Sequence, residues 1–344
     1  MKTKWGVWGS GGIARRRTIP EGIVAADNAE LTAVYDVNAE ANKEVAEEIG
    51  AAACDSEDAL LETDCDIVYV ATPANLHCDQ VVCAAKAGKH VLCEKPLGMT
   101  VEEAERMIAA CDDNGVKLGT AFMMRFHAQH QEALALIRDG KIGTPVLGRA
   151  QLSCWYPPIP GAWRQQPDQS GGGSLMDMGG HCIDLLEMFY GRASKVQCVT
   201  GNIVHEYKSE DTAVVMLEFE NGAKGIVDNL FNVPDASSKN RLELYGSKGS
   251  ILAEGTIGQG ELGEMTACLE SGDAGYEAQQ ARSGAGGLAI TPNPVNMYRA
   301  EVEAFAQAVL DDREPPVSAE EGLWSQRVLA ACYESAKSGC VVSL

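Results

Sequence analysis

The chain has 344 residues, of which 45% are hydrophobic, and its formal net charge is −21. This length suits about two domains with a buried core, and no apolar run approaches the roughly 20 residues that span a bilayer. The negative charge argues against nucleic acid and membranes as partners, because long-range repulsion opposes contact with phosphates and anionic lipids. An uncharged substrate is the easier guest.

The 12 cysteines are scattered, without a C-x-x-C pair or the His/Cys spacing of metal ligands. The chain also enters its first predicted strand without a charged leader followed by an apolar run. We therefore expect a cytoplasmic protein with reduced thiols and no metal site.

A short apolar run over residues 4–8 is typical of a buried strand. The pattern G-x-G-x-x-A follows it directly and comprises Gly9, Ser10, Gly11, Gly12, Ile13 and Ala14. Such a turn lets backbone N–H groups approach a pyrophosphate, whose charge the positive end of the next helix favours. A second predicted strand, residues 31–35, ends at Asp36, about 20 residues beyond the turn. This order predicts a dinucleotide site that includes the turn and Asp36.

The residues around Asp36 favour NAD over NADP. A carboxylate there can accept hydrogen bonds from both adenosine ribose hydroxyls and repels a 2′-phosphate. Val37 and Asn38 follow it, so no cation stands beside it in the sequence, and we include Val37 in the site. The arginines at positions 15–17 leave an alternative open. One or two of them can serve a phosphate, or all three can belong to a solvated helical turn.

Strands and helices then alternate, with strands predicted at 66–71 and 90–93 and helices at 76–87 and 101–114. This alternation predicts an α/β Rossmann-like doubly wound parallel sheet in a domain of residues 1–122. Ligands of such sheets bind beyond the carboxyl ends of the strands. We therefore expect the turns at Thr72, Pro73 and at Glu94, Lys95 to face the cofactor.

Lys95 stands out in the second of these turns because Pro96 restricts its backbone toward the extended region. An ammonium held there can bind a substrate hydroxyl and stabilise the alkoxide character that develops as hydride leaves. The alternative is an ordinary exposed lysine in a turn.

The pattern changes from about residue 144 onward. Six strands are predicted at 146–153, 196–204, 212–220, 223–230, 241–245 and 250–253, and two closing helices at 297–310 and 321–337. A run of strands after βα units predicts a separate α+β domain, residues 123–344, whose C-terminal helices we expect to pack back toward the first domain. The stretch 255–287 is rich in glycine and small residues and is predicted to be mostly loop.

Aromatic and arginine side chains lie between the first strand of that domain and the next motif: Trp155, Tyr156, Trp163 and Arg164. Aromatic faces and a guanidinium fork suit a sugar ring, whose C–H face stacks and whose hydroxyls need donors. The alternative is ordinary packing at a domain junction. Arg125 and His130 are weaker candidates for the same substrate pocket.

Asp177 and His181 lie four residues apart, where the run Gly171–Gly173 gives way to an apolar helical pattern. On a helix this spacing stacks a carboxylate and an imidazole on one face. The carboxylate can fix the imidazole tautomer and support the imidazolium, so the pair can act as a general base near neutral pH. The alternative is a helix with one capping Asp and one structurally satisfied His.

Together these motifs resemble the Gfo/Idh/MocA oxidoreductases, relatives of glucose-fructose oxidoreductase and inositol 2-dehydrogenase. The resemblance rests on the glycine turn, the Thr72 turn with His77, the Glu94–Pro96 turn, the Asp177 and His181 segment, and the ending Tyr333–Gly339. It implies Lys95, Asp177 and His181 as the catalytic set and a second domain with a large open, mostly antiparallel sheet. It also implies cofactor contacts at Asn75 and His77. One departure is Ala74, where many members carry Asn.

We therefore expect an NAD-dependent oxidoreductase that transfers a hydride between a hydroxyl of a sugar, glycoside or cyclic polyol and the nicotinamide ring. His181 takes the hydroxyl proton, Asp177 orients the imidazole, and Lys95 stabilises the alkoxide; which of Lys95 and His181 is the formal base is left open. Two alternatives use the same residues: an NAD-dependent glycoside hydrolase with transient oxidation, and a non-catalytic nucleotide and sugar sensor. A broad sheet in the second domain favours a homodimer or homotetramer.

Overall fold

The structure is a computed structural model that describes residues 1–270 and 287–344. The chain forms two compact units, each assembled from three segments. The first unit comprises Met1–Met123, Trp163–Gly172 and Asn296–Arg327, and the second comprises Met124–Ala162, Gly173–Val295 and Val328–Leu344. The division of the sequence after residue 122 stays a prediction about domains.

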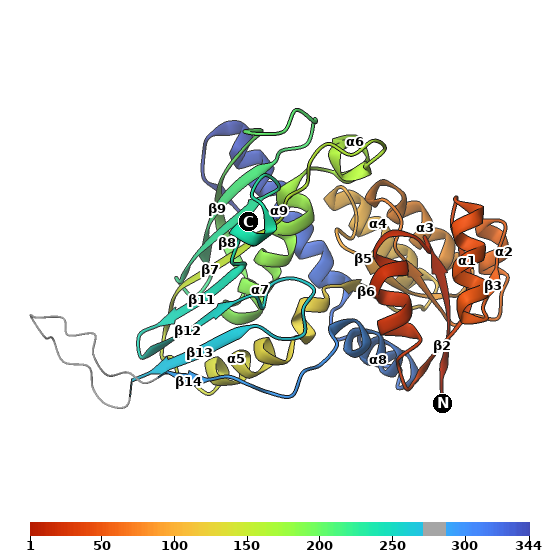
Figure 1. The fold of residues 1–344 in the computed structure, drawn as a ribbon, viewed down its shortest axis with the longest axis horizontal. Helices are drawn as coiled ribbons and strands as arrows, with labels where there is room; N and C mark the ends of the chain where they lie inside the picture. Colours follow the sequence, from red (N-terminus) through yellow and green to blue (C-terminus); the bar gives the residue numbers. More distant parts are fainter. Residues whose placement is uncertain (271–286) are drawn as a thin grey trace, which may run out of the picture. The chain divides into compact units, whose positions relative to one another are not determined.

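The first unit contains a six-stranded parallel sheet with the order β3-β2-β1-β4-β5-β6. Figure 1 labels β2, β3, β5 and β6 of this sheet. This order places the topological switch point between β1 and β4, where doubly wound sheets bind their ligands. The predicted doubly wound parallel sheet is confirmed. Its strands are β1 (Thr3–Trp8), β2 (Ala29–Tyr35), β3 (Ala52–Ala53), β4 (Ile67–Val70), β5 (His90–Glu94) and β6 (Leu118–Ala121).

Alternate residues of these strands point into two separate cores, as in a sheet that is covered on both faces. On β4, Val68 and Val70 join one core and Ile67 and Tyr69 join the other. The helices and short helical turns of this unit are η1 (Ala14–Ile23), α1 (Ala39–Ile49), α2 (Glu57–Leu61), α3 (Ala74–Lys86), α4 (Val101–Asp113), η3 (Trp163–Gln165), α6 (Pro167–Ser170) and α8 (Met297–Leu310).

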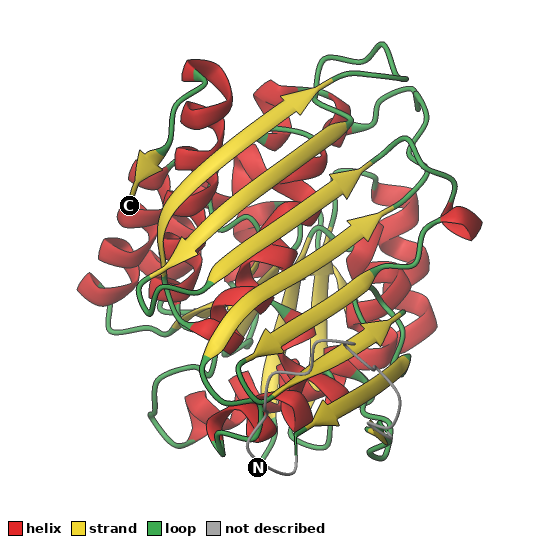
Figure 2. Cartoon of the chain, turned by 90° about the vertical axis from the view of Figure 1, so that its left-hand side faces the viewer, coloured by secondary structure: helices red, strands yellow, loops and turns green. Residues whose placement is uncertain are grey.

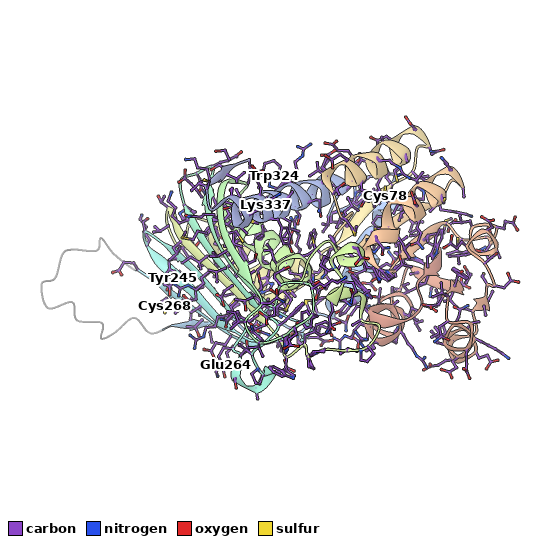
Figure 3. The ribbon with its side chains drawn as sticks, turned by 90° about the horizontal axis from the view of Figure 1, so that it is seen from above. Cys78, Tyr245, Glu264, Cys268, Trp324 and Lys337 are labelled. Atoms are coloured by element: carbon purple, nitrogen blue, oxygen red, sulfur yellow. The ribbon has the colours of Figure 1, made fainter. Side chains whose placement is uncertain are left out.

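The long helix α9 (Ala319–Ser338) contributes to both units, since its residues up to Arg327 belong to the first and the rest to the second. Figure 3 labels one residue in each half, Trp324 and Lys337. The short turn η2 (Met123–Phe126) marks the first passage of the chain between the units. No helix in the described parts of the chain is long and apolar enough to cross a bilayer.

The second unit is built on a nine-stranded sheet with the order β14-β13-β12-β11-β7-β10-β9-β8-β15. Every pair of neighbouring strands among the described residues of this sheet is antiparallel except β7 with β10, so the predicted large, mostly antiparallel sheet is confirmed. The strands are β7 (Pro145–Ser153), β8 (Ala193–Gly201), β9 (Thr212–Phe219), β10 (Lys224–Leu230), β11 (Arg241–Gly246), β12 (Gly249–Glu254), β13 (Glu264–Leu269), β14 (Leu288–Ala289) and β15 (Val342–Ser343).

One face of this sheet carries the helix that holds His181. The helical elements of the unit are α5 (Ala128–Arg138), η4 (Leu175–Gly179), α7 (Gly180–Tyr190) and η5 (Asp235–Ser237). Gly148 on β7 lets α7 approach closely, because a Cβ there would lie 2.8 Å from Leu186 and 3.0 Å from the Tyr190 ring. Figure 2 views the opposite face of the sheet, in front of which no helix of the described chain is drawn.

The expectation that residues 255–287 are mostly loop is wrong for residues 264–269, which form β13. Met265 and Ala267 are buried on one face of this strand, and β13 extends the sheet beside β12. The glycines on its N-terminal side masked this short alternation, which is the signal for a half-buried strand. Residues 271–286 of the same stretch lie outside the described part of the chain.

Candidate active site

The glycine turn after β1 is shaped by Gly9 and Gly12, whose φ angles are +91° and +50°. A Cβ on Gly9 would lie 2.9 Å from the backbone of Ala71 and Thr72, so only glycine fits against the end of β4. Gly12 is exposed, and no described atom lies within 4 Å of the position its Cβ would take. The turn thus packs tightly on the sheet and leaves backbone open on its other side, which fits a pyrophosphate.

Asp36 lies beside this turn at the end of β2. Its Oδ2 accepts the N–H of Gly11 at 3.0 Å, and its Oδ1 accepts the N–H of Asn38 at 2.9 Å. Ser10 is buried and donates to Oδ1 of Asn42 at 2.9 Å, so it fastens the turn to α1. Val37 is 88% exposed. The carboxylate therefore stands where a ribose would follow a pyrophosphate, and its predicted role fits this placement.

Two of the three arginines after the turn form ion pairs with glutamates. Arg15 lies 3.0 Å from Glu44, and Arg17 lies 3.2 Å from Glu21. The Arg17 guanidinium also lies over the ring of Tyr298, 5.2 Å from its centre. These contacts favour the interpretation of the run as a helical turn that pairs with neighbouring acids.

His77 joins the two turns that were expected to face the cofactor. It is buried on α3, with Nδ1 2.9 Å from the Pro96 carbonyl oxygen and Nε2 2.9 Å from the Thr72 carbonyl oxygen. Burial lowers the pKa of His77, and the two carbonyls oppose this shift. The ring holds the Thr72 and Lys95 turns at a fixed separation, whereas Asn75 in the first turn of α3 is exposed. Cofactor contacts of both residues stay predictions.

Glu94 is the centre of a polar network at the carboxyl end of β5. The hydroxyl of the buried Tyr69 donates to Oε1 of Glu94 at 2.5 Å, and the N–H of Lys95 donates to Oε2 at 3.2 Å. The Tyr69 oxygen also lies 3.0 Å from Oγ1 of the buried Thr18. Glu94 is therefore held by Tyr69 of β4 and by its own turn, and Thr18 of η1 in turn contacts Tyr69.

Cations surround this carboxylate within the first unit. Burial raises the pKa of Glu94, while the charges of Lys95 and Arg164 and the Tyr69 hydroxyl oppose the rise. The Arg164 guanidinium stacks on the ring of Trp163, 4.3 Å from its centre. The structure thus brings together four residues that the sequence placed in a site: Glu94, Lys95, Trp163 and Arg164.

Asp177 and His181 lie in one continuous helical stretch of the second unit. Asp177 belongs to η4, a π-helical turn in which the N–H of Gly180 donates to the Leu175 carbonyl, and His181 follows in the first turn of α7. Single π turns inserted into helices occur frequently at functional sites. Asp177 is half-buried and His181 is 6% exposed. Their catalytic roles stay predictions.

The glycine run before Asp177 is held by a residue that sequence reasoning missed. Glu210 accepts the N–H groups of Gly173 at 2.8 Å and of Leu175 at 3.0 Å, and the Tyr333 hydroxyl donates to it at 2.9 Å. No local pattern indicates Glu210, because its partners lie far away along the chain. Tyr333 stands in the ending that supported the family resemblance, but that motif did not indicate a contact.

Arg125 forms a buried ion pair with Asp184, three residues after His181 on α7. Its Nε lies 2.9 Å from both carboxylate oxygens and its Nη2 lies 2.6 Å from Oδ1. Such a multiply hydrogen-bonded pair holds both partners in a fixed geometry. The guanidinium therefore contacts the helix of His181, and its predicted contact with substrate stays a prediction.

Trp155 and Tyr156 follow β7 and belong to an aromatic cluster in the second unit. The Trp155 ring lies 5.0 Å from His205, which stacks on Tyr207 at 5.2 Å. Tyr156 lies 4.9 Å from Phe231. Trp155 remains 43% exposed, so its indole can still stack on a ligand. His205 and Tyr207 were not expected in this cluster.

No group of three or more His, Cys, Asp or Glu side chains within residues 1–270 and 287–344 is arranged to hold a metal ion.

Two family comparisons match most of the chain. Residues 3–122 match a family described as "Oxidoreductase family, NAD-binding Rossmann fold". Residues 130–252 match the "GFO/IDH/MocA C-terminal domain".

Individual relatives match over the full length. The chain is 32% identical over 342 residues to D-xylose 1-dehydrogenase (NADP(+)) 2 of Haloferax volcanii, covering 99% of each chain. It is 29% identical over 340 residues to 1,5-anhydro-D-fructose reductase of Ensifer adhaerens, covering 98% of this chain and 97% of the relative. Among solved structures, the aldose-aldose oxidoreductase of Caulobacter crescentus complexed with glycerol superposes with a TM-score of 0.88, 29% identity and complete coverage of both chains.

Proposed function

The chain belongs to the Gfo/Idh/MocA oxidoreductase family, and from this premise we propose that it is an NAD-dependent dehydrogenase of a carbohydrate or cyclic polyol. The observation that carries the proposal is the hydrogen-bonded turn of Glu94 and Lys95 at the carboxyl end of β5, in the same sheet as the glycine turn and Asp36. That end of a doubly wound sheet is where a dinucleotide and its substrate meet.

The bound dinucleotide supplies the hydride acceptor or donor. The Lys95 ammonium binds the reacting hydroxyl and stabilises the negative charge that develops on its oxygen. The His181 imidazole takes the hydroxyl proton, and the Asp177 carboxylate orients the ring and stabilises the imidazolium. In the alternative assignment Lys95 is a neutral amine and takes that proton in place of His181.

Asp36 supports NAD as the cofactor. Its carboxylate is fixed beside the glycine turn by two backbone N–H groups, where it would repel a 2′-phosphate. Arg15 pairs with Glu44 and Arg17 pairs with Glu21, so neither ion pair places a guanidinium against Asp36. The name of the Haloferax relative includes NADP(+), so cofactor choice has to be measured for this chain.

The relatives' names and the aromatic cluster support a sugar as the substrate. The curated relatives are named for a D-xylose and a 1,5-anhydro-D-fructose reaction. In the second unit Trp155 offers a partly exposed indole, which suits the C–H face of a sugar ring. In the first unit Arg164 offers a guanidinium, which suits sugar hydroxyl groups. No relative named above is a glycoside hydrolase, and nothing in the site favours hydrolysis over oxidation.

The outer face of the nine-stranded sheet supports self-association. Exposed apolar side chains on this face are Val199, Val214, Met216 and Leu252. Figure 3 labels Tyr245 on β11 and Cys268 on β13 in the same sheet. We expect a homodimer or homotetramer that buries this face. Sedimentation of the purified protein measures the number of subunits.

A screen of sugars, inositols and glycosides with NAD tests the proposed function. We expect one NADH per molecule of keto product and no release of an aglycone, with absorbance of the reduced cofactor as the readout. A boiled-protein control and a Lys95→Ala control exclude background reduction. Free aglycone formed with catalytic NAD and without NADH would contradict the dehydrogenase assignment.

A further inference from the structure

The segment that leads into the Asp177 and His181 helix is held by a carboxylate from another part of the chain. Glu210, just before β9, is 9% exposed and directs both carboxylate oxygens at the backbone of the glycine run. Its Oε2 accepts the Gly173 N–H at 2.8 Å, and its Oε1 accepts the Leu175 N–H at 3.0 Å. These two donors flank Ser174, so the carboxylate bridges the first turn of the helical stretch.

The backbone of Glu210 adds a further contact to the same run. Its carbonyl oxygen accepts the Ser174 N–H at 3.0 Å. A Cβ on Gly173 would lie 2.0 Å from this carbonyl oxygen, so only a glycine lets the two backbones meet. Gly173 in turn accepts the N–H of Asp177 through its own carbonyl at 3.0 Å. Asp177 is therefore hydrogen-bonded to Gly173, and Gly173 is hydrogen-bonded to Glu210.

The C-terminal part of α9 fixes the carboxylate itself. The Tyr333 hydroxyl donates to Oε1 of Glu210 at 2.9 Å. Burial and the Glu210 charge raise the pKa of Tyr333 well above its ordinary value, so this hydroxyl keeps its proton and donates. Two residues later, the Ser335 hydroxyl accepts the N–H of Cys198 on β8 at 3.0 Å and donates to the Cys340 carbonyl at 2.6 Å. The sequence ending is thus fastened to the sheet and to Glu210.

We propose that Glu210 and Tyr333 are positioning residues for the reaction, which hold the glycine run so that η4 presents Asp177, and α7 presents His181, in a fixed geometry. This inference rests on the proposed function, because it assigns the two residues to the catalytic helix. Catalytic groups lose activity when they are displaced by about an ångström. The C-terminal motif, which makes no contact with a reacting group in this account, acts through Glu210.

The matched test compares two buried tyrosine hydroxyls in the same unit. Tyr333→Phe removes the donor to Glu210 at the N-terminal side of the catalytic segment. Tyr190→Phe removes a hydroxyl that donates to the Leu147 and Tyr245 carbonyls at the C-terminal end of α7. Glu210→Gln keeps the size of the side chain but turns an amide N–H₂ toward backbone donors. Measurements include kcat, KM, NADH affinity by titration, and amide hydrogen exchange of peptides covering residues 173–181.

For Tyr333→Phe we expect kcat to fall about tenfold and exchange in 173–181 to accelerate by a similar factor, with NADH affinity unchanged within about twofold. Tyr190→Phe is expected to leave kcat and hydrogen exchange in residues 173–181 unchanged, even if it lowers the melting temperature as much as Tyr333→Phe does. Glu210→Gln should lower kcat further. Exchange and kcat in Tyr333→Phe that match those in Tyr190→Phe would overturn the proposal, as would faster exchange with unchanged kcat.

Failure of the proposed function has a different signature. If the wild-type chain oxidises none of the tested sugars or polyols, the dehydrogenase assignment fails, and hydrogen exchange still reports on the anchoring. Faster exchange in Tyr333→Phe then supports the hold of Glu210 on the glycine run, and unchanged exchange overturns it.

Discussion

Two glycine runs in this chain each contact a carboxylate from a distant position, but the carboxylates have different surroundings. At the first run, the half-buried Asp36 accepts one N–H from Gly11 and stands beside open backbone. At the second run, Glu210 is buried and accepts two N–H groups and a tyrosine hydroxyl. The same chemistry can thus serve a ligand where it remains accessible, and hold a helix where it is enclosed.

Each run is followed by π-helical hydrogen bonding. In η1 the N–H of Val24 donates to the Ile19 carbonyl, and in η4 the N–H of Gly180 donates to the Leu175 carbonyl. A π turn re-aims the side chains that follow it relative to an α-helix. The first π-helical segment follows the dinucleotide turn, and the second carries Asp177. Variants near the first segment should therefore change nucleotide binding, and variants near the second should change turnover.

The largest effect is expected from the reacting groups. Lys95→Ala and His181→Ala should each lower kcat by on the order of a hundredfold or more, because both act on the reacting hydroxyl. NAD affinity should change by less than about threefold, since both residues are proposed to act on the substrate hydroxyl and not on the adenosine half of the cofactor. Steady-state kinetics with parallel NAD titration measures both quantities. Near-normal turnover in both variants would remove the proposed site.

Acid should destabilise the second unit through two enclosed imidazoles. His127 and His130 are fully buried with ring centres 4.5 Å apart. Burial lowers the pKa of His127 to about 4, and burial together with the neighbouring His127 lowers the pKa of His130 to about 3. An unfolded chain takes up protons near pH 6.5. The unfolded state therefore binds more protons, and stability falls as pH drops from about 6.5 toward 4 and 3.

The expected slope is about 1.4 kcal/mol per pH unit for each imidazole, and replacing one ring should halve it. Between pH 7 and pH 5, the free energy of unfolding of His127→Phe should therefore fall by about 2 kcal/mol less than that of wild type. Urea unfolding at several pH values measures this slope. His90→Gln is a partial control, because His90 on β5 is only half-buried. Equal slopes in wild type and His127→Phe would contradict the assignment.

The half-buried Asp36 should determine the preference between NAD and NADP without affecting the rate of the chemical step. We expect wild type to bind NAD at least tenfold more tightly than NADP, a difference of about 1.4 kcal/mol. Asp36→Asn should remove most of this preference, because an amide no longer repels a 2′-phosphate, and kcat at saturating NAD should stay within about twofold. Titration with both nucleotides tests this. A wild-type preference for NADP would show that the arginines override Asp36.

The smallest effect is expected from the first of those arginines. Arg15 pairs with Glu44 on α1, and both side chains are largely exposed. Exposed pairs contribute roughly 0–1 kcal/mol, so Arg15→Ala should change stability and the affinities for NAD and NADP only slightly, by less than about twofold for binding. A selective loss of NADP affinity in this variant would assign Arg15 to a phosphate and weaken the case for NAD.

Elements with a strong local pattern were predicted well from the sequence. The helix predicted at 297–310 is α8, Met297–Leu310, and the strands before the Thr72 and Lys95 turns lie within one or two residues of their expected positions. These segments either alternate apolar and polar residues at a helical period or are continuously apolar. Their turns carry Gly or Pro, which mark the boundaries.

Elements whose burial depends on distant partners were missed. In β6, Gly119 is buried because the Phe305 ring of α8 lies 2.7 Å from where its Cβ would be, and a Leu-Gly-Thr-Ala stretch gives no apolar run. In α5 the buried residues include Gln129 and His130, which break the apolar stripe. The side-chain oxygen of Gln129 accepts the N–H of Gly263, and its amide nitrogen donates to the carbonyl oxygens of Gly263 and Ile290, far along the chain.

The site divides in the same way. Glu94 and Lys95 are adjacent in sequence, and Asp177 and His181 are four residues apart, so local spacing was enough to select them. Glu210 meets Gly173 across a separation of 37 residues and Tyr333 across 123. No local period encodes such contacts, and they became visible only with the three-dimensional arrangement of the second unit.

The discontinuity of the first unit limits how its nucleotide-binding half can be exchanged between relatives. Val302, Phe305 and Ala306 of α8 fill the core beside Trp5, although they come some 300 residues later in a chain of 344. A chimaera joined near residue 123 would combine one parent's sheet with the other parent's α8. The apolar side chains of α8 and of the sheet would then come from different parents and would pack poorly. Grafting of a cofactor preference therefore requires the joint transfer of Met1–Met123 and Asn296–Arg327, with Trp163–Gly172 as the third piece of the graft.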